Sequence, residues 1–314
     1  MRKRRVLVFG VIGLALLSVV VLIQMGPSSP SNQPLATRGR LGASGNKIAV
    51  AYLDGAIAEG RSSVATTGGI TPRLVARYLK KLEADSSVRA VVFRIDSPGG
   101  SVAASQAIAG MIEEFSKPVV VSMGDIVASG GYYIAAPADR IFAMPGTMTG
   151  SIGVITSIMD LHGLYDKLGI KDQVIKSGQH KDMYQRTLTQ EERELVQKLS
   201  DAAYEQFVAY VATHRGLPVE RVRELATGEL FLGSQAVELG LVDSLGDLDD
   251  AVAAAAELAG VESPVVYEVP APVFLVDLWG LLGEVQAFAK TVVLSPEERL
   301  LWRLREQPML EMRY

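Results

Sequence analysis

The chain has 314 residues, 48% of them hydrophobic, which is enough apolar material for one large folded domain with extensions and excludes a disordered chain. Its 31 basic and 35 acidic residues are well mixed and give a formal net charge of −4, so no basic surface is expected to bind nucleic acid. The sequence contains no cysteine, which excludes disulfides, zinc–cysteine sites and cysteine nucleophiles. Any nucleophile must therefore be an oxygen or an amine.

The first 25 residues predict a membrane anchor. Basic residues dominate positions 1–5, and residues 6–25 form an apolar run whose only polar members are Ser18 and Gln24. A helix of this length spans roughly 30 Å at about 1.5 Å per residue, the thickness of a bilayer core. A cleaved signal peptide is the alternative, but its apolar run is usually shorter, and no A-x-A site follows directly. Because basic flanks stay in the cytoplasm, we expect a single-pass protein of the cell membrane whose N-terminus is cytoplasmic and whose remaining chain is extracytoplasmic.

Residues 26–46 are rich in Gly, Pro and Ser and predict a flexible tether. From residue 47 the sequence alternates buried-strand patterns with helical ones. Strands are expected over residues 47–55, 88–100 and 117–130, and helices over residues 71–85 and 101–115. Residues 130–146 are expected to form a short helix followed by a strand. This alternation is typical of an α/β domain with mostly parallel pairing.

The second half of the chain is more helical. Residues 189–216 have apolar positions at helical spacing, and Thr189 with Glu192 resembles a capping box at the start. A shorter helix, strand and helix series follows and closes the domain near Gly260. The tail, residues 261–314, is apolar but interrupted by charges, which argues against a second membrane span. It fits an amphipathic helix on the membrane or on a neighbouring subunit, and equally a buried core helix.

Three glycine-rich turns follow apolar strands: DSPGGS (96–101), ASGGY (128–132) and TGSIG (149–153). Glycine lets the backbone approach a ligand closely and point successive N–H groups at one place. Ser129 lies at a strand-to-helix turn beside the amide of Gly130, and Gly99 or Gly100 would supply a second donor for an oxyanion. The alternative is that Ser129 only caps the helix that begins at Gly130.

The candidates for a general base are few. The chain has three histidines, His162, His180 and His214, and a lysine serves only if burial lowers its pKa from about 10.4 by roughly 3 pH units. Lys181 lies next to His180 in IKSGQHKDM. A lysine in such a polar loop is more often a solvated surface residue, so the residues alone leave its role open.

The motifs IDSPGGSV, SMGDIVASGGYYIAAPADRIFAMPGTMTGSIGVI and VIKSGQHKD, with TQEER after them, closely resemble the signal peptide peptidase SppA family, or protease IV, in its short bacterial form. The resemblance covers about residues 47–260 and includes the anchor. It implies a ClpP/crotonase-like fold and a Ser/Lys dyad. Carried over by motif, Ser129 is the nucleophile, Lys181 is the base, Ser151 orients the lysine, and Gly100 joins Gly130 in the oxyanion hole.

The sequence departs from the family in one place. Family members usually have a proline between the KD motif and the acidic helix, whereas KDMYQRTLTQEER has none and is shorter. This loop is expected to shape the substrate groove differently without removing the dyad.

These observations predict a membrane-anchored serine endopeptidase that degrades cleaved signal peptides or other hydrophobic peptides outside the cytoplasm. No cofactor or metal is implied, because histidine is scarce and cysteine is absent. Long members of the family contain tandem copies of the fold and share their sites between copies, so a single-copy chain is expected to form a homo-oligomeric ring with shared sites. The alternatives are a crotonase-type acyl-CoA enzyme and an inactive membrane scaffold. The anchor and the Ser/Lys pair argue against the first, and the scaffold would leave Ser129, Ser151 and Lys181 unexplained.

Overall fold

The computed structural model describes residues 46–59, 69–169, 171 and 173–270. The predicted anchor (6–25), nearly all of the tether and the tail beyond residue 270 lie outside the described residues. Within the described ranges, no helix combines the length and the hydrophobicity needed to cross a membrane.

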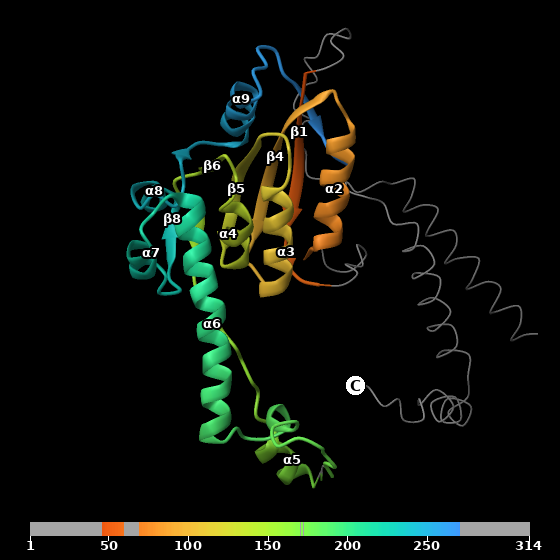
Figure 1. Cartoon of the computed structure of the whole chain (residues 1–314), viewed down its shortest axis with the longest axis vertical. Coiled ribbons are helices and arrows are strands. Elements are labelled where there is room, and N and C mark those ends of the chain that lie inside the picture. Colours follow the sequence, from red (N-terminus) through yellow and green to blue (C-terminus); the bar gives the residue numbers. More distant parts are fainter. Residues whose placement is uncertain (1–45, 60–68, 170, 172, 271–314) are drawn as a thin grey trace, which may run out of the picture. The chain divides into compact units, whose positions relative to one another are not determined.

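The centre of the fold is a mostly parallel sheet of eight strands in the order β10-β1-β4-β5-β6-β9, with β7 paired to β5 and β8 (Figure 1). All its pairings are parallel except that of β7 with β8. The central strands are rich in Val and Ile and are largely buried on both faces, as expected for parallel strands covered by helices. The strands are β1 (Lys47–Asp54), β4 (Val88–Ser97), β5 (Val119–Ala128), β6 (Arg140–Ala143), β7 (Met148–Gly150), β8 (Leu230–Leu232), β9 (Ser244–Leu245) and β10 (Val265–Glu268), while β2 (Ala56–Ile57) and β3 (Gly69–Ile70) form a separate parallel pair.

The helices begin where the sequence supplies a cap. The Oγ1 of Thr71 accepts a hydrogen bond from the N–H of Leu74 at the start of α2, and Ser101 caps α3 in the same way. The helices are α2 (Pro72–Ala84), α3 (Val102–Glu113), α4 (Gly130–Ala135), α5 (His162–Leu168), α6 (Gln190–Arg215), α7 (Val219–Leu225), α8 (Gly233–Glu238) and α9 (Leu248–Leu258), with a 3-10 turn at Met183–Gln185. The alternation of strands and helices predicted for residues 47–146 is confirmed.

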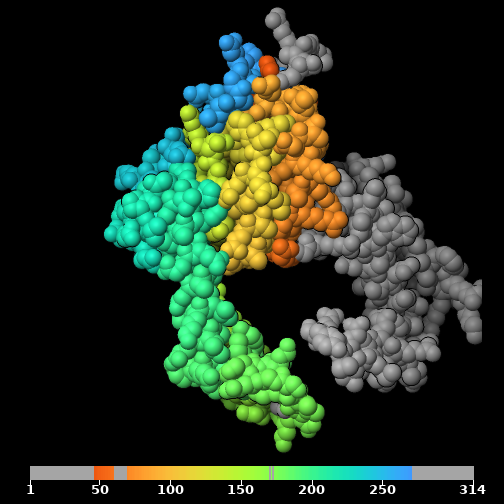
Figure 2. All heavy atoms as spheres, in the orientation of Figure 1, coloured from red at the N-terminus to blue at the C-terminus, as the bar shows by residue number. Residues whose placement is uncertain are grey.

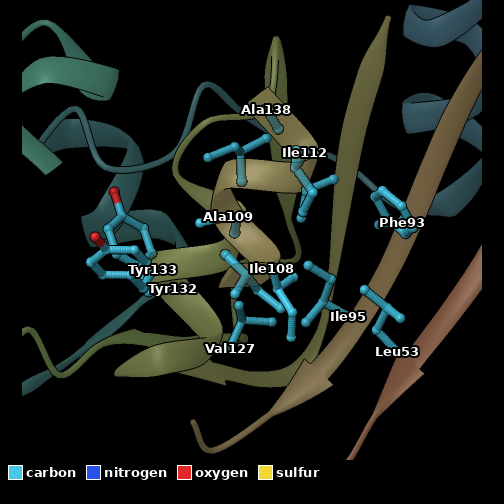
Figure 3. Close-up of a cluster of buried hydrophobic side chains, with 14 of the residues drawn as sticks. Leu53, Phe93, Ile95, Ile108, Ala109, Ile112, Val127, Tyr132, Tyr133 and Ala138 are labelled. Atoms are coloured by element: carbon cyan, nitrogen blue, oxygen red, sulfur yellow. The ribbon is translucent and has the colours of Figure 1, made fainter. Parts of the chain in front are cut away.

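Two hydrophobic clusters hold the sheet between helices. On one face, Ile108 and Ile112 of α3 pack toward Phe93 and Ile95 of β4 (Figure 3). On the other face, the alanine-rich helix α9 packs against a smaller cluster that includes Val92. Phe93 is fully buried, and burial of a side chain of this size stabilises the fold by about 1.5–3 kcal/mol. The helices thereby fix the positions of the carboxyl ends of β4 and β5.

The sequence pattern predicts that the domain ends near Gly260, but the sheet extends beyond that residue. Strand β10 pairs in parallel with β1, with Val265 opposite Lys47 and Glu268 opposite Val50. This strand is short and half-exposed, so it lacks a strong apolar pattern.

Helix α6 is long, and only its C-terminal half joins the main core. Its 26 residues span about 39 Å at roughly 1.5 Å per residue. Phe207 and Val208 are buried in the core, whereas Leu199 is 66% exposed. In Figure 1 the N-terminal half of α6 extends past the ends of α3 and α4, toward the segment that contains α5, and Figure 2 shows this green part as an arm that projects from the main body. The capping box of Thr189 and Glu192 is present at its start, as predicted.

Candidate active site

The three glycine-rich turns meet at the carboxyl end of the sheet. Strands β5 and β7 are parallel neighbours, with Ala128 opposite Gly150, and the N–H of Ser129 donates to the carbonyl of Gly150 at 2.8 Å. Ser129 and Ser151 therefore follow two paired residues at the ends of adjacent strands. This is the juxtaposition that the family resemblance implies.

Both serines have a strained backbone. Ser129 has φ 52° and Ser151 has φ 48°, and no other residue except glycine has a positive φ within the described ranges. Such conformations cost about 1–3 kcal/mol and gather at functional sites. The side chain of Ser129 makes no capping hydrogen bond to α4, so its interpretation as a simple helix cap is wrong. Instead, the turn resembles the strand-to-helix elbow that exposes a nucleophile in other hydrolases.

Two backbone amides next to Ser129 are available for a ligand. The N–H of Gly99 donates to Ser97 Oγ at 3.1 Å, whereas the N–H of Gly100 has no hydrogen-bond partner among the described residues. The N–H of Gly130 lies in the first turn of α4, where N–H groups have no partner within the helix. The first hydrogen bond of this helix runs from the N–H of Tyr133 to the carbonyl of Ser129. The sequence offers Gly99 and Gly100 as alternative donors, and the family resemblance favours Gly100. The hydrogen bond to Gly99 favours the same choice.

These amides are held close together because the glycines leave no room between the two turns. A Cβ on Gly130 would lie 3.2 Å from the amide nitrogen of Gly100, and a Cβ on Gly99 would lie 2.9 Å from the Cβ of Ser129. A Cβ on Gly100 would lie 1.9 Å from the carbonyl oxygen of Ile57. The glycines of SPGG and ASGG are therefore required by the close approach of one backbone to the other.

A small, mostly apolar cavity of about 30 Å³ opens beside Ser129. Its aromatic wall is ordered by ring contacts: Tyr133 stacks on Tyr210 with centroids 4.1 Å apart and lies 5.1 Å from Phe207. None of the three histidines lines this cavity. Its lining comprises Gly100, Val102, Ser105, Gln106, Ser129, Gly130, Tyr133, Gly153, Val154, Ala203 and Phe207.

The structure places Lys181 away from this cavity. Lys181 is exposed and lies in the segment that precedes α6, and the adjacent His180 contacts Glu192 in the first turn of that helix. The cavity beside Ser129, in contrast, is reached by Ala203 of the same helix. From residue 192 to residue 203 the helix rises roughly 16 Å. A single chain therefore brings together Ser129, Ser151, Gly100 and Gly130 but not Lys181.

Sequence reasoning missed the charged network around Lys181. Arg186 binds both Glu192 and Asp182, and its hydrogen bonds hold the pKa of the Glu192 carboxyl well below its usual range. The sequence pattern predicts for Glu192 only a place in the capping box with Thr189. Across the ranges that the structure describes, no group of three or more His, Asp and Glu side chains is arranged to bind a metal ion.

Comparisons with known proteins identify the family. Residues 112–262 match the model of peptidase family S49, and residues 65–151 match that of Clp protease. The chain is 46% identical over 220 residues to "Putative protease slr0021" of Synechocystis sp., which covers 69% of this chain and 76% of the relative. It is 37% identical over 275 residues to "Putative signal peptide peptidase SppA" of Enterococcus faecium, covering 80% of each. The chain belongs to peptidase family S49.

Membership of this family confirms the resemblance of the motifs to SppA. The chain is a serine peptidase with a mixed α/β, ClpP-like fold, and the match to the Clp protease model spans the strands and turns that surround Ser129. Among solved structures, a mutant of the 1510-N membrane-bound stomatin-specific protease superposes with a TM-score of 0.47 at 17% identity, covering 74% of this chain and 100% of that chain.

Proposed function

We propose that Ser129 is the nucleophile of this S49 peptidase, that Lys181 of a neighbouring chain is its general base, and that the enzyme cuts peptides at the outer side of the cell membrane. The observation that carries the proposal is the strained turn at Ser129, where a serine hydroxyl and the free amide of Gly100 lie beside the first turn of α4. A helix cap needs neither the strain nor the unpaired amide. An acyl-transfer site needs both a presented nucleophile and donors for the oxyanion.

The chemistry follows from these positions. The Oγ of Ser129 attacks the scissile carbonyl carbon while its proton passes to the amine of Lys181, and the N–H groups of Gly100 and Gly130 stabilise the oxyanion. Collapse of the intermediate breaks the C–N bond, and Lys181 returns the proton to the leaving amine. Water then attacks the acyl-enzyme with the same base. Ser151, at the end of the neighbouring strand, orients the lysine amine.

The distance of Lys181 from its own Ser129 supports a site shared between chains. The segment around Lys181 also presents large apolar side chains to solvent: Ile155 is 90% exposed, Met159 78% and Leu199 66%. Apolar surface of this kind marks protein interfaces. We propose that it contacts the next subunit of a closed ring, so that each Lys181 reaches the Ser129 of a neighbour.

The membrane location and the substrates rest on the sequence. In this proposal residues 1–5 are cytoplasmic, residues 6–25 anchor the chain and residues 26–46 form a linker. The peptidase domain begins at residue 47 and includes β10, which pairs with β1, so the C-terminal extension begins after that strand. An anchored peptidase meets hydrophobic peptides at the membrane surface, and one relative is named a signal peptide peptidase. Remnant signal peptides are therefore the proposed substrates.

Digestion of a signal-peptide library tests this function. The purified chain should cleave hydrophobic peptides, and Ser129→Ala should abolish cleavage without changing the melting temperature. A Ser129→Ala chain that cleaves the library as fast as the wild type would refute the assignment of the nucleophile.

A further inference from the structure

The segment that carries Lys181 is attached to the first turn of α6 by charged side chains around one buried carboxylate. Glu192 is only 1% exposed, although it belongs to neither hydrophobic cluster. Its Oε2 accepts a hydrogen bond from Arg186 Nη1 at 2.8 Å, and its Oε1 accepts one from Arg186 Nη2 at 2.6 Å. The same Oε1 lies 3.2 Å from His180 Nδ1. Glu192 thus joins residues on both sides of Lys181.

The two immediate neighbours of Lys181 are both held by this network. His180 contacts Glu192, and Asp182 accepts hydrogen bonds from Arg186 Nε at 3.2 Å and from Lys176 Nζ at 2.5 Å. The backbone N–H of Lys181 donates to the carbonyl of Gly178 at 3.3 Å, but its exposed side-chain amine makes no hydrogen bond or ion pair with the described residues. The chain on either side is fixed, while the amine is left available.

The network depends on the charge of Glu192. A carboxylate removed from water must be compensated, and a two-pronged guanidinium contact compensates it with a defined orientation that a lysine would not supply. The first turn of a helix adds a favourable dipole for a negative charge. A helix cap alone does not explain the arrangement, because a glutamine at this position caps equally well.

We propose that Glu192 is a positioning residue: by binding Arg186 and His180 it fixes the Lys181 segment in the place from which the amine reaches the serine of the neighbouring chain. This inference rests on the proposed function, because it requires that Lys181 be the base. It adds that the carboxylate acts on the lysine of its own chain, and not on the serine of its own chain.

The first test compares the kinetic effects of two substitutions near the start of α6. Glu192→Gln keeps the cap of Thr189 and the side-chain shape but loses the charge that Arg186 binds. The matched control is Glu194→Gln, because Glu194 is exposed and its side chain bonds, among the described residues, only with that of Gln190. We expect Glu192→Gln to lower kcat at least about tenfold with KM within about twofold, and Glu194→Gln to leave both within about twofold. Equal kcat values in the two variants would overturn the proposal.

The second test separates positioning from general stability by mixing inactive chains. Ser129→Ala chains supply the lysine and Lys181→Ala chains supply the serine, so reassembled mixtures recover activity only at shared sites. Glu192→Gln is added to one parent or to the other. Added to the Ser129→Ala parent, it should lower the recovered activity at least about tenfold, and added to the Lys181→Ala parent it should change that activity by less than about twofold. Equal losses in both placements would show a merely structural role and refute the proposal.

The outcomes distinguish this inference from the proposed function. If the parent mixture lacking Glu192→Gln recovers no activity, the shared site is wrong, and the kcat comparison in otherwise wild-type chains decides the role of Glu192. If Lys181→Ala alone is fully active, the lysine is not the base and the positioning role falls with it. If Glu192→Gln melts earlier than the wild type, Glu192→Asp, which keeps the charge, should restore kcat further than it restores the melting temperature.

Discussion

Replacement of Gly100 by alanine tests the oxyanion hole with a magnitude set by the structure. The added Cβ would lie 1.9 Å from the carbonyl oxygen of Ile57, whereas real Cβ contacts essentially never fall below 3.0 Å. The Gly100 backbone must therefore move by at least about 1 Å, and a misplacement of that size costs roughly 10²-fold in rate. Loss of one oxyanion donor costs about 10²–10³ in kcat, or about 2.7–4 kcal/mol. We expect Gly100→Ala to lower kcat about 10²-fold or more with little change in KM.

The assay is steady-state peptide hydrolysis, normalised to folded chain by the melting transition. Gly110→Ala is the matched control, because a Cβ at that position of α3 meets nothing within 4 Å and alanine favours helix. The control should keep kcat within about twofold of the wild type. A folded Gly100→Ala chain with kcat within about threefold of the wild type would show that this amide does not stabilise the transition state.

Three further predictions follow from the site. Ser151→Ala should lower turnover markedly and leave the melting temperature unchanged; turnover within about twofold of the wild type, an effect below roughly 0.5 kcal/mol, would favour a turn serine without a catalytic part. Lys181→Ala should abolish hydrolysis, whereas His180→Ala should lower kcat less than about tenfold, and the reverse order would make histidine the base. Hydrogen bonds from Arg186 depress the pKa of Glu192 in the folded chain below its ordinary value of 4.5. The contribution of the Glu192 carboxylate to the free energy of unfolding should therefore be complete above pH 4.5 and be lost as the pH falls through the lower pKa of the folded chain. Calorimetry should show a smaller acid-induced loss of stability in Glu192→Gln; an equal loss would contradict this.

Much of the peptidase domain could be predicted from the sequence because its signals are local. The apolar runs in β4 and β5 and the capping box at Thr189 each act within a few residues, and the elements expected from them are present. The three turns could be predicted to meet because parallel strands end at one edge of the sheet.

The remaining features depend on contacts that no local pattern encodes. The distance between Lys181 and Ser129 is set by the length of α6 and by where that helix joins the core, near Phe207. The choice between the two turn amides depends on the hydrogen bond that the N–H of Gly99 donates to Ser97 Oγ, which occupies Gly99 and leaves Gly100 as the candidate donor. The second role of Glu192 depends on Arg186, which folds back onto the first turn of α6.

Covalent labelling of the full chain with a fluorophosphonate, followed by peptide mapping, tests the central claim most directly. If Ser129 is a nucleophile activated by Lys181, the adduct forms on Ser129, and Lys181→Ala slows its formation by orders of magnitude while the fold stays intact. An unlabelled Ser129 in a chain that hydrolyses peptides, or an adduct on another serine such as Ser151, would contradict the account.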